Sequence, residues 1–86
     1  MAALKILYFA WVREQVGMSE ESVVLPVEIE TAAQLINFLA AQSDRHALAF
    51  ANPDKLRCAV DQVIMPLSSP LGSAKEVAFF PPVTGG

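Results

Sequence analysis

The segment that most constrains the fold is the apolar run Val77–Phe80, which is followed at once by Pro81 and Pro82. Four consecutive apolar residues predict a strand buried within a sheet, near its centre. Proline has no N–H group to donate, so the two prolines end the strand pairing and favour an extended polyproline conformation. We therefore expect a folded domain over residues 1–80 and a short, stiff tail over residues 81–86 that protrudes from it.

The tail ends in Val83, Thr84, Gly85 and Gly86. Because glycine has no Cβ, its backbone can pass through a channel that is too narrow for other residues. The reactive group at this end is the α-carboxylate of Gly86, which is anionic at neutral pH and a poor electrophile until another protein activates it. The alternative is a terminus without function, since the last residues of most domains are poorly ordered. The apolar strand that leads into the tail favours the first interpretation.

The composition bounds the class of protein. A chain of 86 residues forms one domain, and 53% hydrophobic against 17% charged residues favours a compact core with an apolar face left for a partner. A net charge of −3 with six scattered basic residues leaves no cationic stripe, so we expect no binding to nucleic acid. The single cysteine, Cys58, and the single histidine, His46, exclude a disulfide framework and a self-contained zinc site, so we expect no metal.

The chain also lacks the patterns that direct a protein to a membrane. Its longest apolar run, from Ile6 to Val12, is too short to span a bilayer. The first residues do not combine a charged segment, an apolar segment and a small-residue cleavage site, as a secretory signal does. We therefore expect a cytoplasmic protein without membrane contact.

Apolar and alternating patterns predict five strands, at residues 4–9, 22–27, 57–60, 63–65 and 76–80. The first and last of these are the most continuously apolar, so we expect them to lie side by side and parallel at the centre of the sheet. Strands buried in this way need a helical layer to cover them.

Three helical segments precede the third strand. A short helical turn at residues 11–16 ends at Gly17, where a left-handed cap is easiest. The main helix begins at Thr31, because Thr31 and Gln34 fit a capping box and apolar residues follow at three- and four-residue spacing. A further short helical piece is expected at residues 47–51. The order of elements predicts an α+β fold of the β-grasp, ubiquitin-like type, with a mixed sheet packed by one main helix.

Strand alternation also predicts an exposed apolar patch beside the root of the tail. If Val77 and Phe79 face the main helix, Ala78 and its lateral neighbours face outward. Each of these neighbours can instead belong to the core, and a basic residue nearby can be a solvated side chain rather than a partner contact. The candidates for a partner interface are Phe80, Phe9, Leu7, Ile64 and Arg13.

The element order together with the ending Phe79–Gly86 resembles the small subunits of molybdopterin synthase, which are sulfur carriers of molybdenum cofactor biosynthesis. The resemblance covers the whole chain and is strongest over Val77–Gly86. The stretches Val12–Glu14 and Ala41–Arg45 support it. Asp61 departs from the pattern, since it stands in a turn where asparagine is expected, and this bears on turn geometry rather than on the carrier role.

The resemblance implies a role for each residue of the tail. A ubiquitin-activating-type enzyme would use ATP to adenylate the carboxylate of Gly86, and sulfur would then replace AMP to leave a thiocarboxylate. Gly85, Thr84 and Val83 would pass through a narrow tunnel of the large synthase subunit, while Pro82 and Pro81 give the tail its direction. The sulfur would attack a cyclic pyranopterin phosphate there. The chain itself would bind no cofactor and would not be an enzyme alone, because the catalytic pocket lies in the large subunit of a heterotetramer.

Other readings of the same residues stay open. The chain can be a sulfur carrier for another pathway, such as thiamin thiazole synthesis, although the Phe-Phe-Pro-Pro segment argues against it. It can also be a ubiquitin-like protein modifier, or an interaction module with an irrelevant tail. Strand alternation favours Cys58 as a buried structural thiol over a sulfur relay. His46 is expected to be a surface helix residue rather than a catalyst.

Overall fold

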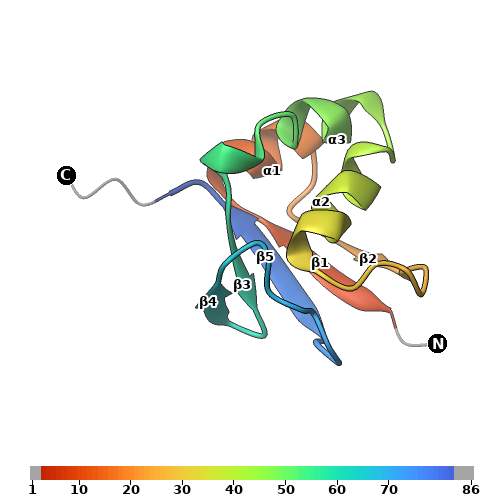
Figure 1. Ribbon diagram of the computed structural model, residues 1–86. Coiled ribbons are helices and arrows are strands. Elements are labelled where there is room, and N and C mark those ends of the chain that lie inside the picture. Colours follow the sequence, from red (N-terminus) through yellow and green to blue (C-terminus); the bar gives the residue numbers. More distant parts are fainter. Residues whose placement is uncertain (1–2, 83–86) are drawn as a thin grey trace.

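Residues 3–82, the part of the chain that the computed structural model describes, form a five-stranded sheet with helices packed on one of its faces (Figure 1). The strand order is β2-β1-β5-β3-β4, in which β1 and β5 run parallel and the other neighbours antiparallel. This mixed sheet confirms the predicted α+β, β-grasp fold. The elements are β1 Leu4–Tyr8, α1 Ala10–Val16, β2 Glu20–Val23, α2 Ala32–Ala40, α3 Asp44–Ala49, the 3₁₀-helix η1 Pro53–Lys55, β3 Arg57–Val60, β4 Val63–Met65 and β5 Glu76–Phe80.

The centre of the sheet is where the apolar pattern placed it. β5 lies between β1 and β3, and the register pairs Ile6 with Val77 and Tyr8 with Phe79. All four of these side chains are at most 1% exposed, because the helices cover this face. The predicted parallel pairing of the first and last strands is confirmed.

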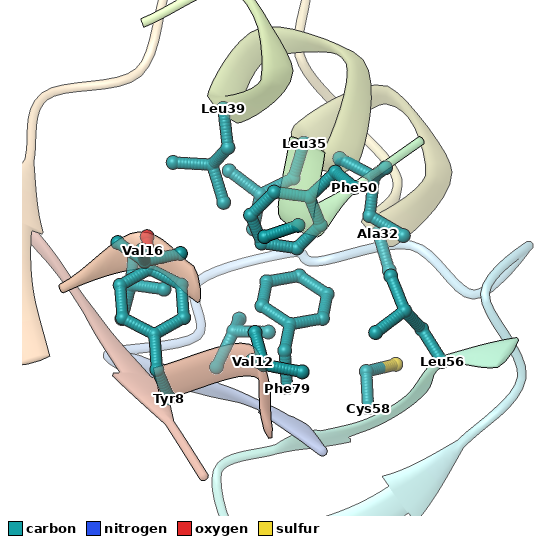
Figure 2. Close-up of a cluster of buried hydrophobic side chains, with 14 of the residues drawn as sticks. Tyr8, Val12, Val16, Ala32, Leu35, Leu39, Phe50, Leu56, Cys58 and Phe79 are labelled. Carbon is teal, nitrogen blue, oxygen red and sulfur yellow. The ribbon is translucent and has the colours of Figure 1, made fainter. Parts of the chain in front are cut away.

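The main helix α2 begins as its sequence requires. Thr31 Oγ1 accepts a hydrogen bond from the Gln34 N–H at 3.2 Å, and Gln34 Oε1 accepts one from the Thr31 N–H at 3.1 Å, which completes the capping box. Figure 2 shows the inward stripe of this helix, including Leu35 and Leu39, above the aromatic side chains of the core. The members of the stripe are Ala32, Leu35, Ile36 and Leu39, and all are buried.

Helix α1 is closed by the glycine cap that the sequence predicts. Gly17 has a φ of 91°, and its N–H donates to the Arg13 carbonyl at 2.8 Å. The Arg45 guanidinium of α3 donates to the last carbonyls of α1, from Nε to Gln15 O at 2.9 Å and from Nη2 to Glu14 O at 3.0 Å. A Cβ on Gly17 would lie 2.9 Å from Arg45 Nε, so another residue would displace that side chain, and the positive φ would strain its backbone.

Two strand boundaries differ from the prediction. The first strand ends at Tyr8 because Phe9 is the N-cap of α1 and Ala10 has a φ of 54°. The second strand is β2, Glu20–Val23, rather than residues 22–27. It begins with two glutamates, because an edge strand tolerates charge on its exposed side.

The helix that follows α2 also starts earlier than predicted. It is α3, Asp44–Ala49, rather than residues 47–51. Ser43 is its N-cap, since Ser43 Oγ accepts a hydrogen bond from the His46 N–H at 3.1 Å. The polar Ser43-Asp44 pair therefore begins a helix instead of only ending the previous one.

The turn between β3 and β4 confirms the predicted hairpin and explains the aspartate in it. Asp61 and Gln62 have φ values of 48° and 73°, as both central residues of a type I′ turn require. Asp61 Oδ1 accepts hydrogen bonds from the N–H groups of Lys75 at 2.9 Å and Glu76 at 3.1 Å. The side chain thus fastens the hairpin turn to the beginning of β5.

Candidate functional site

The root of the tail lies at the end of the central strand. β5 ends at Phe80. Pro81 and Pro82 follow it, and both are half-buried and pair with no strand. The Phe9 N–H donates to the Phe79 carbonyl at 3.1 Å, which places the start of α1 beside the end of β5. The tail residues singled out from the sequence beyond this point, Val83, Thr84, Gly85 and Gly86, lie outside the described residues.

The cross-strand register assembles an apolar row on the face of the sheet opposite the helices. Leu7 pairs with Ala78, Ala78 with Ala59, and Ala59 with Ile64, so the row crosses four strands. Residues that pair across neighbouring strands point to the same face. We call these four residues, together with Phe80 at the end of the same face of β5, the outer patch.

The structure brings three of the predicted interface residues into this patch. Leu7 and Phe80 are half-buried, while Ile64 is 70% exposed although it is a large aliphatic side chain. Phe9, the N-cap of α1, is 47% exposed. Its backbone hydrogen bond to Phe79 places it next to the outer patch. Sequence reasoning missed Ala59, which the strand register alone could have revealed.

Arg13 lies on α1 and is exposed. The ion pairs within residues 3–82 are Lys5 with Glu20 at 3.5 Å and His46 with Glu21 at 2.7 Å, so Arg13 takes part in neither. A guanidinium without an internal partner can pair with a carboxylate of another protein. Its role at an interface stays a prediction.

Cys58 is fully buried on the helix side of β3. Its Sγ donates a weak hydrogen bond to the Met65 carbonyl at 3.3 Å, and burial raises the pKa of the thiol. The thiolate, which is the nucleophilic form, is therefore disfavoured. The prediction of a buried structural thiol is confirmed.

His46 is not the surface residue that the sequence suggested. It is 6% exposed, with Nε2 2.7 Å from Glu21 Oε2 and Nδ1 2.7 Å from Ser43 Oγ. The Tyr8 hydroxyl donates to the same Glu21 oxygen at 2.6 Å. Burial first, and then the hydrogen bond to Glu21 and its charge, raise the pKa of Tyr8. The prediction failed because the polar partner of His46 comes from β2, 25 residues away in the chain.

Two hollows lie away from the outer patch. One of about 630 Å³ is at the opposite end of β1 and β5, under the loops that carry Leu25, Ile29 and Leu71. The other, of about 370 Å³, lies between α1, α3 and η1. Among residues 3–82, no group of three or more His, Cys, Asp or Glu side chains is placed to hold a metal ion. None of the helices described is long and apolar enough to cross a membrane.

The sequence matches characterised proteins over nearly its whole length. The model of the ThiS family matches residues 6–86. The molybdopterin synthase sulfur carrier subunit of Escherichia coli strain K12 is 47% identical over 83 residues, which are 96% of this chain and 99% of that protein. The protein with the same description from Mycobacterium tuberculosis is 33% identical over 86 residues and the full length of both chains.

Solved structures are similar as well. The putative molybdopterin converting factor subunit 1 of Pyrococcus furiosus has a TM-score of 0.73 at 27% identity, over 96% of this chain and 100% of that one. SAMP1 of Haloferax volcanii has a TM-score of 0.71 at 20% identity, over 99% of this chain and 100% of that one. At 20% identity, the similarity to SAMP1 concerns the fold alone, and it agrees with the ubiquitin-like sheet described above.

Proposed function

Because the chain belongs to the ThiS family, we propose that it is the sulfur carrier subunit of a molybdopterin synthase, with the carboxylate of Gly86 as the point where sulfur is loaded. The observation that carries the proposal is the 47% identity, over 99% of its length, with a protein described as such a subunit. The names of the relatives also indicate a partner, a larger subunit of the same synthase. An adenylating enzyme is the second partner we propose.

The loading chemistry follows from the low reactivity of a carboxylate. A carboxylate oxygen of Gly86 would attack the α-phosphate of ATP on a ubiquitin-activating-type enzyme, with pyrophosphate as the leaving group. The acyl adenylate has a good leaving group, so a sulfide-level donor displaces AMP and leaves a thiocarboxylate. No oxidation or reduction of the carbon is needed. The sulfur of a thiocarboxylate is a soft anionic nucleophile, which the original carboxylate is not.

Delivery would take place in a pocket of the large subunit. The thiocarboxylate sulfur forms a bond to a carbon of a cyclic pyranopterin phosphate as the carbon–oxygen bond there breaks, and the displaced oxygen leaves as water or stays on the opened phosphate. Water then cleaves the acyl–sulfur bond, which leaves the sulfur on the pterin and returns the carboxylate of Gly86. A dithiolene holds two sulfur atoms, so two loaded carriers are consumed for each product. The carrier contributes no catalytic side chain to this step.

The geometry at the tail root is suited to such a delivery. β5 is the central strand and is held on both edges, by β1 and by β3, up to Phe80. The tail therefore starts from a rigid base, and Pro81 and Pro82 restrict its conformations, which lowers the entropy lost when it is inserted. The outer patch beside this base supplies an apolar surface for the receiving protein.

An intact-mass measurement tests the loading step. The chain is purified from cells with an active pathway and from cells that lack the adenylating enzyme. We expect an oxygen-for-sulfur exchange, confined to the C-terminal peptide, in the first sample only. Finding the plain carboxylate in both samples would contradict the proposal. A ladder of larger adducts on other proteins would instead indicate a protein modifier.

A further inference from the structure

Two basic side chains lie at or just before the start of β3, the strand that pairs with the end of β5, and the proposed function does not yet use either of them. Arg57 opens β3, and its cross-strand partner is Phe80, the last residue of β5. Lys55 ends η1, two residues earlier. Both side chains are exposed, and neither belongs to the ion pairs found within residues 3–82. Their charges are therefore available to another molecule.

The position of Arg57 is well defined. Because paired residues of neighbouring strands share a face, its side chain leaves the sheet on the same side as Phe80 and the outer patch. Its Nη1 donates to the carbonyls of Leu56 at 2.9 Å and Asp54 at 3.4 Å. These bonds leave the Nε–Nη2 edge of the guanidinium without a partner in the described part of the chain. That edge has the geometry for two parallel hydrogen bonds to one carboxylate.

Lys55 lies in η1, just before β3. It borders the hollow of about 370 Å³ between α1, α3 and η1, which Trp11 and Leu48 also line. Trp11 comes two residues after Phe9, and Lys55 two residues before Arg57, so two of the segments that line the hollow continue into residues beside the tail root. Leu48 is 65% exposed at its rim, and no acidic residue lines it. A protein that encloses the tail root would extend over this hollow.

The charge of this end contrasts with the rest of the molecule. The chain carries a net charge of −3. At the far end of the outer face, Lys5 is already paired with Glu20 at 3.5 Å, and Glu76 lies beside it in the register. Beside Lys55 in η1 stands an exposed acid, Asp54, whose carboxylate takes part in neither ion pair of residues 3–82. The tail thus leaves a locally positive edge of an acidic protein.

We propose that Arg57 and Lys55 select the protein that receives the tail, by pairing with carboxylates around its tail-binding pocket. This inference rests on the proposed function, because it takes the large synthase subunit as the occupant. Arg57 is the stronger determinant, since its planar fork binds a carboxylate bidentately beside the apolar contact of Phe80. Lys55 acts mainly through its charge. Rim charges of this kind raise the association rate and are screened by salt.

The test compares two charge reversals that change the net charge equally. Arg57→Glu alters the tail root, and Lys75→Glu alters an exposed residue just before β5, roughly 16 Å away along the strand direction. Association of each full-length variant with the purified large subunit from the same organism is followed by stopped flow at low and high ionic strength. We expect Arg57→Glu to lower the association rate about tenfold at low salt and Lys75→Glu to lower it little. Arg57→Lys should retain most of the wild-type rate.

Each outcome separates this inference from the proposed function. A wild-type chain that does not bind the large subunit would overturn the proposed function, and the inference with it. Equal rates for Arg57→Glu and Lys75→Glu, with normal wild-type binding, would overturn the inference alone. So would a loss confined to binding of the adenylating enzyme. Arg57→Gln, which removes the charge with a shorter but still polar side chain, guards against a folding defect, and thermal melting of all variants accompanies the binding data.

Discussion

Both faces of the sheet carry apolar side chains, but only one of them is covered by helices. On the inner face, Tyr8 and Phe79 are at most 1% exposed beneath the helices, as Figure 2 shows for the aromatic core. On the outer face, Leu7 and Phe80 are half-buried and Ile64 is 70% exposed. Burial stabilises a fold in proportion to the apolar area removed from water. The inner face therefore holds the domain together, and the outer face retains apolar area for a partner.

Phe79 and Phe80 make this contrast within two consecutive residues. The Phe79 ring packs edge-on against Phe50, with 5.3 Å between the ring centroids. Phe80 points to the opposite face and its side chain is partly solvated. The same residue type thus has two roles, which the alternation of a strand separates without any change in the backbone.

The largest expected effect comes from truncating these two neighbours. Phe79→Ala should cost about 3–5 kcal/mol of unfolding free energy because it empties the centre of the core. Phe80→Ala should cost under about 1 kcal/mol of stability, but weaken binding of the large subunit by about 2 kcal/mol, as loss of an interface anchor does. Urea unfolding and titration calorimetry measure the two quantities. Similar stability losses for both variants would show that the faces do not divide in this way.

The pH dependence of stability above pH 10 should reflect the buried hydroxyl of Tyr8 on the inner face. The pKa of Tyr8 is raised, so in the folded protein it keeps its proton where the unfolded chain has lost it. Its contribution to stability is complete below the unfolded pKa of about 10 and is lost above it, at about 1.4 kcal/mol per pH unit. Tyr8→Phe removes this term, so its stability should fall less steeply above pH 10 than that of the wild type.

Thermal or urea unfolding at several alkaline pH values checks this difference. Cys58 also has a raised pKa, and it adds a decline of the same sign in both proteins, which cancels in the comparison. Near neutral pH, Tyr8→Phe should lose about 1 kcal/mol because Glu21 gives up a hydrogen bond. Parallel pH profiles for the two proteins would contradict the burial of this hydroxyl.

A buried thiol on the inner face should matter for stability and not for sulfur transfer. Cys58→Ala removes one atom from a well-packed site, so we expect a loss of about 1 kcal/mol. Dithiolene formation from the loaded carrier should keep its normal rate, because the sulfur never passes through this residue. Reconstitution with preloaded protein measures it. A large fall in that rate would make Cys58 part of the transfer route.

The smallest stability effect is expected at the most exposed apolar residue of the outer patch. Ile64→Ser should change the unfolding free energy by less than about 0.5 kcal/mol, as other surface substitutions do. Binding of the large subunit should weaken measurably if the outer patch is covered in the complex. Isothermal titration and a melting curve on the same sample separate the two effects. Unchanged binding would limit the interface to Phe80 and the tail root.

Local signals in the sequence were sufficient for most of this fold. The capping box at Thr31 and the glycine cap at Gly17 are set by neighbours within one helical turn, and both are present. The apolar runs at residues 4–9 and 76–80 identified the central strands. The edge strand β2 begins two residues earlier than predicted, because charged side chains occur both on an edge strand and in a turn.

Long-range partners were the part that the sequence could not reveal. His46 is buried because Glu21 reaches it from β2, and no local pattern announces that contact. In the sequence, Arg57 is only one of the scattered basic residues. Its place beside Phe80 follows only from the β3–β5 register. The outer patch was predicted from alternation, but its lateral order and Ala59 required the pairing of four strands.

Reconstitution of the synthase tests whether the carboxylate of Gly86 carries the sulfur. The purified large subunit and the cyclic pyranopterin precursor are mixed with the carrier in its carboxylate form, in its thiocarboxylate form, and with one extra residue after Gly86. We expect dithiolene to form with the thiocarboxylate form alone. Dithiolene at the same rate from the carboxylate form or from the extended chain would contradict it.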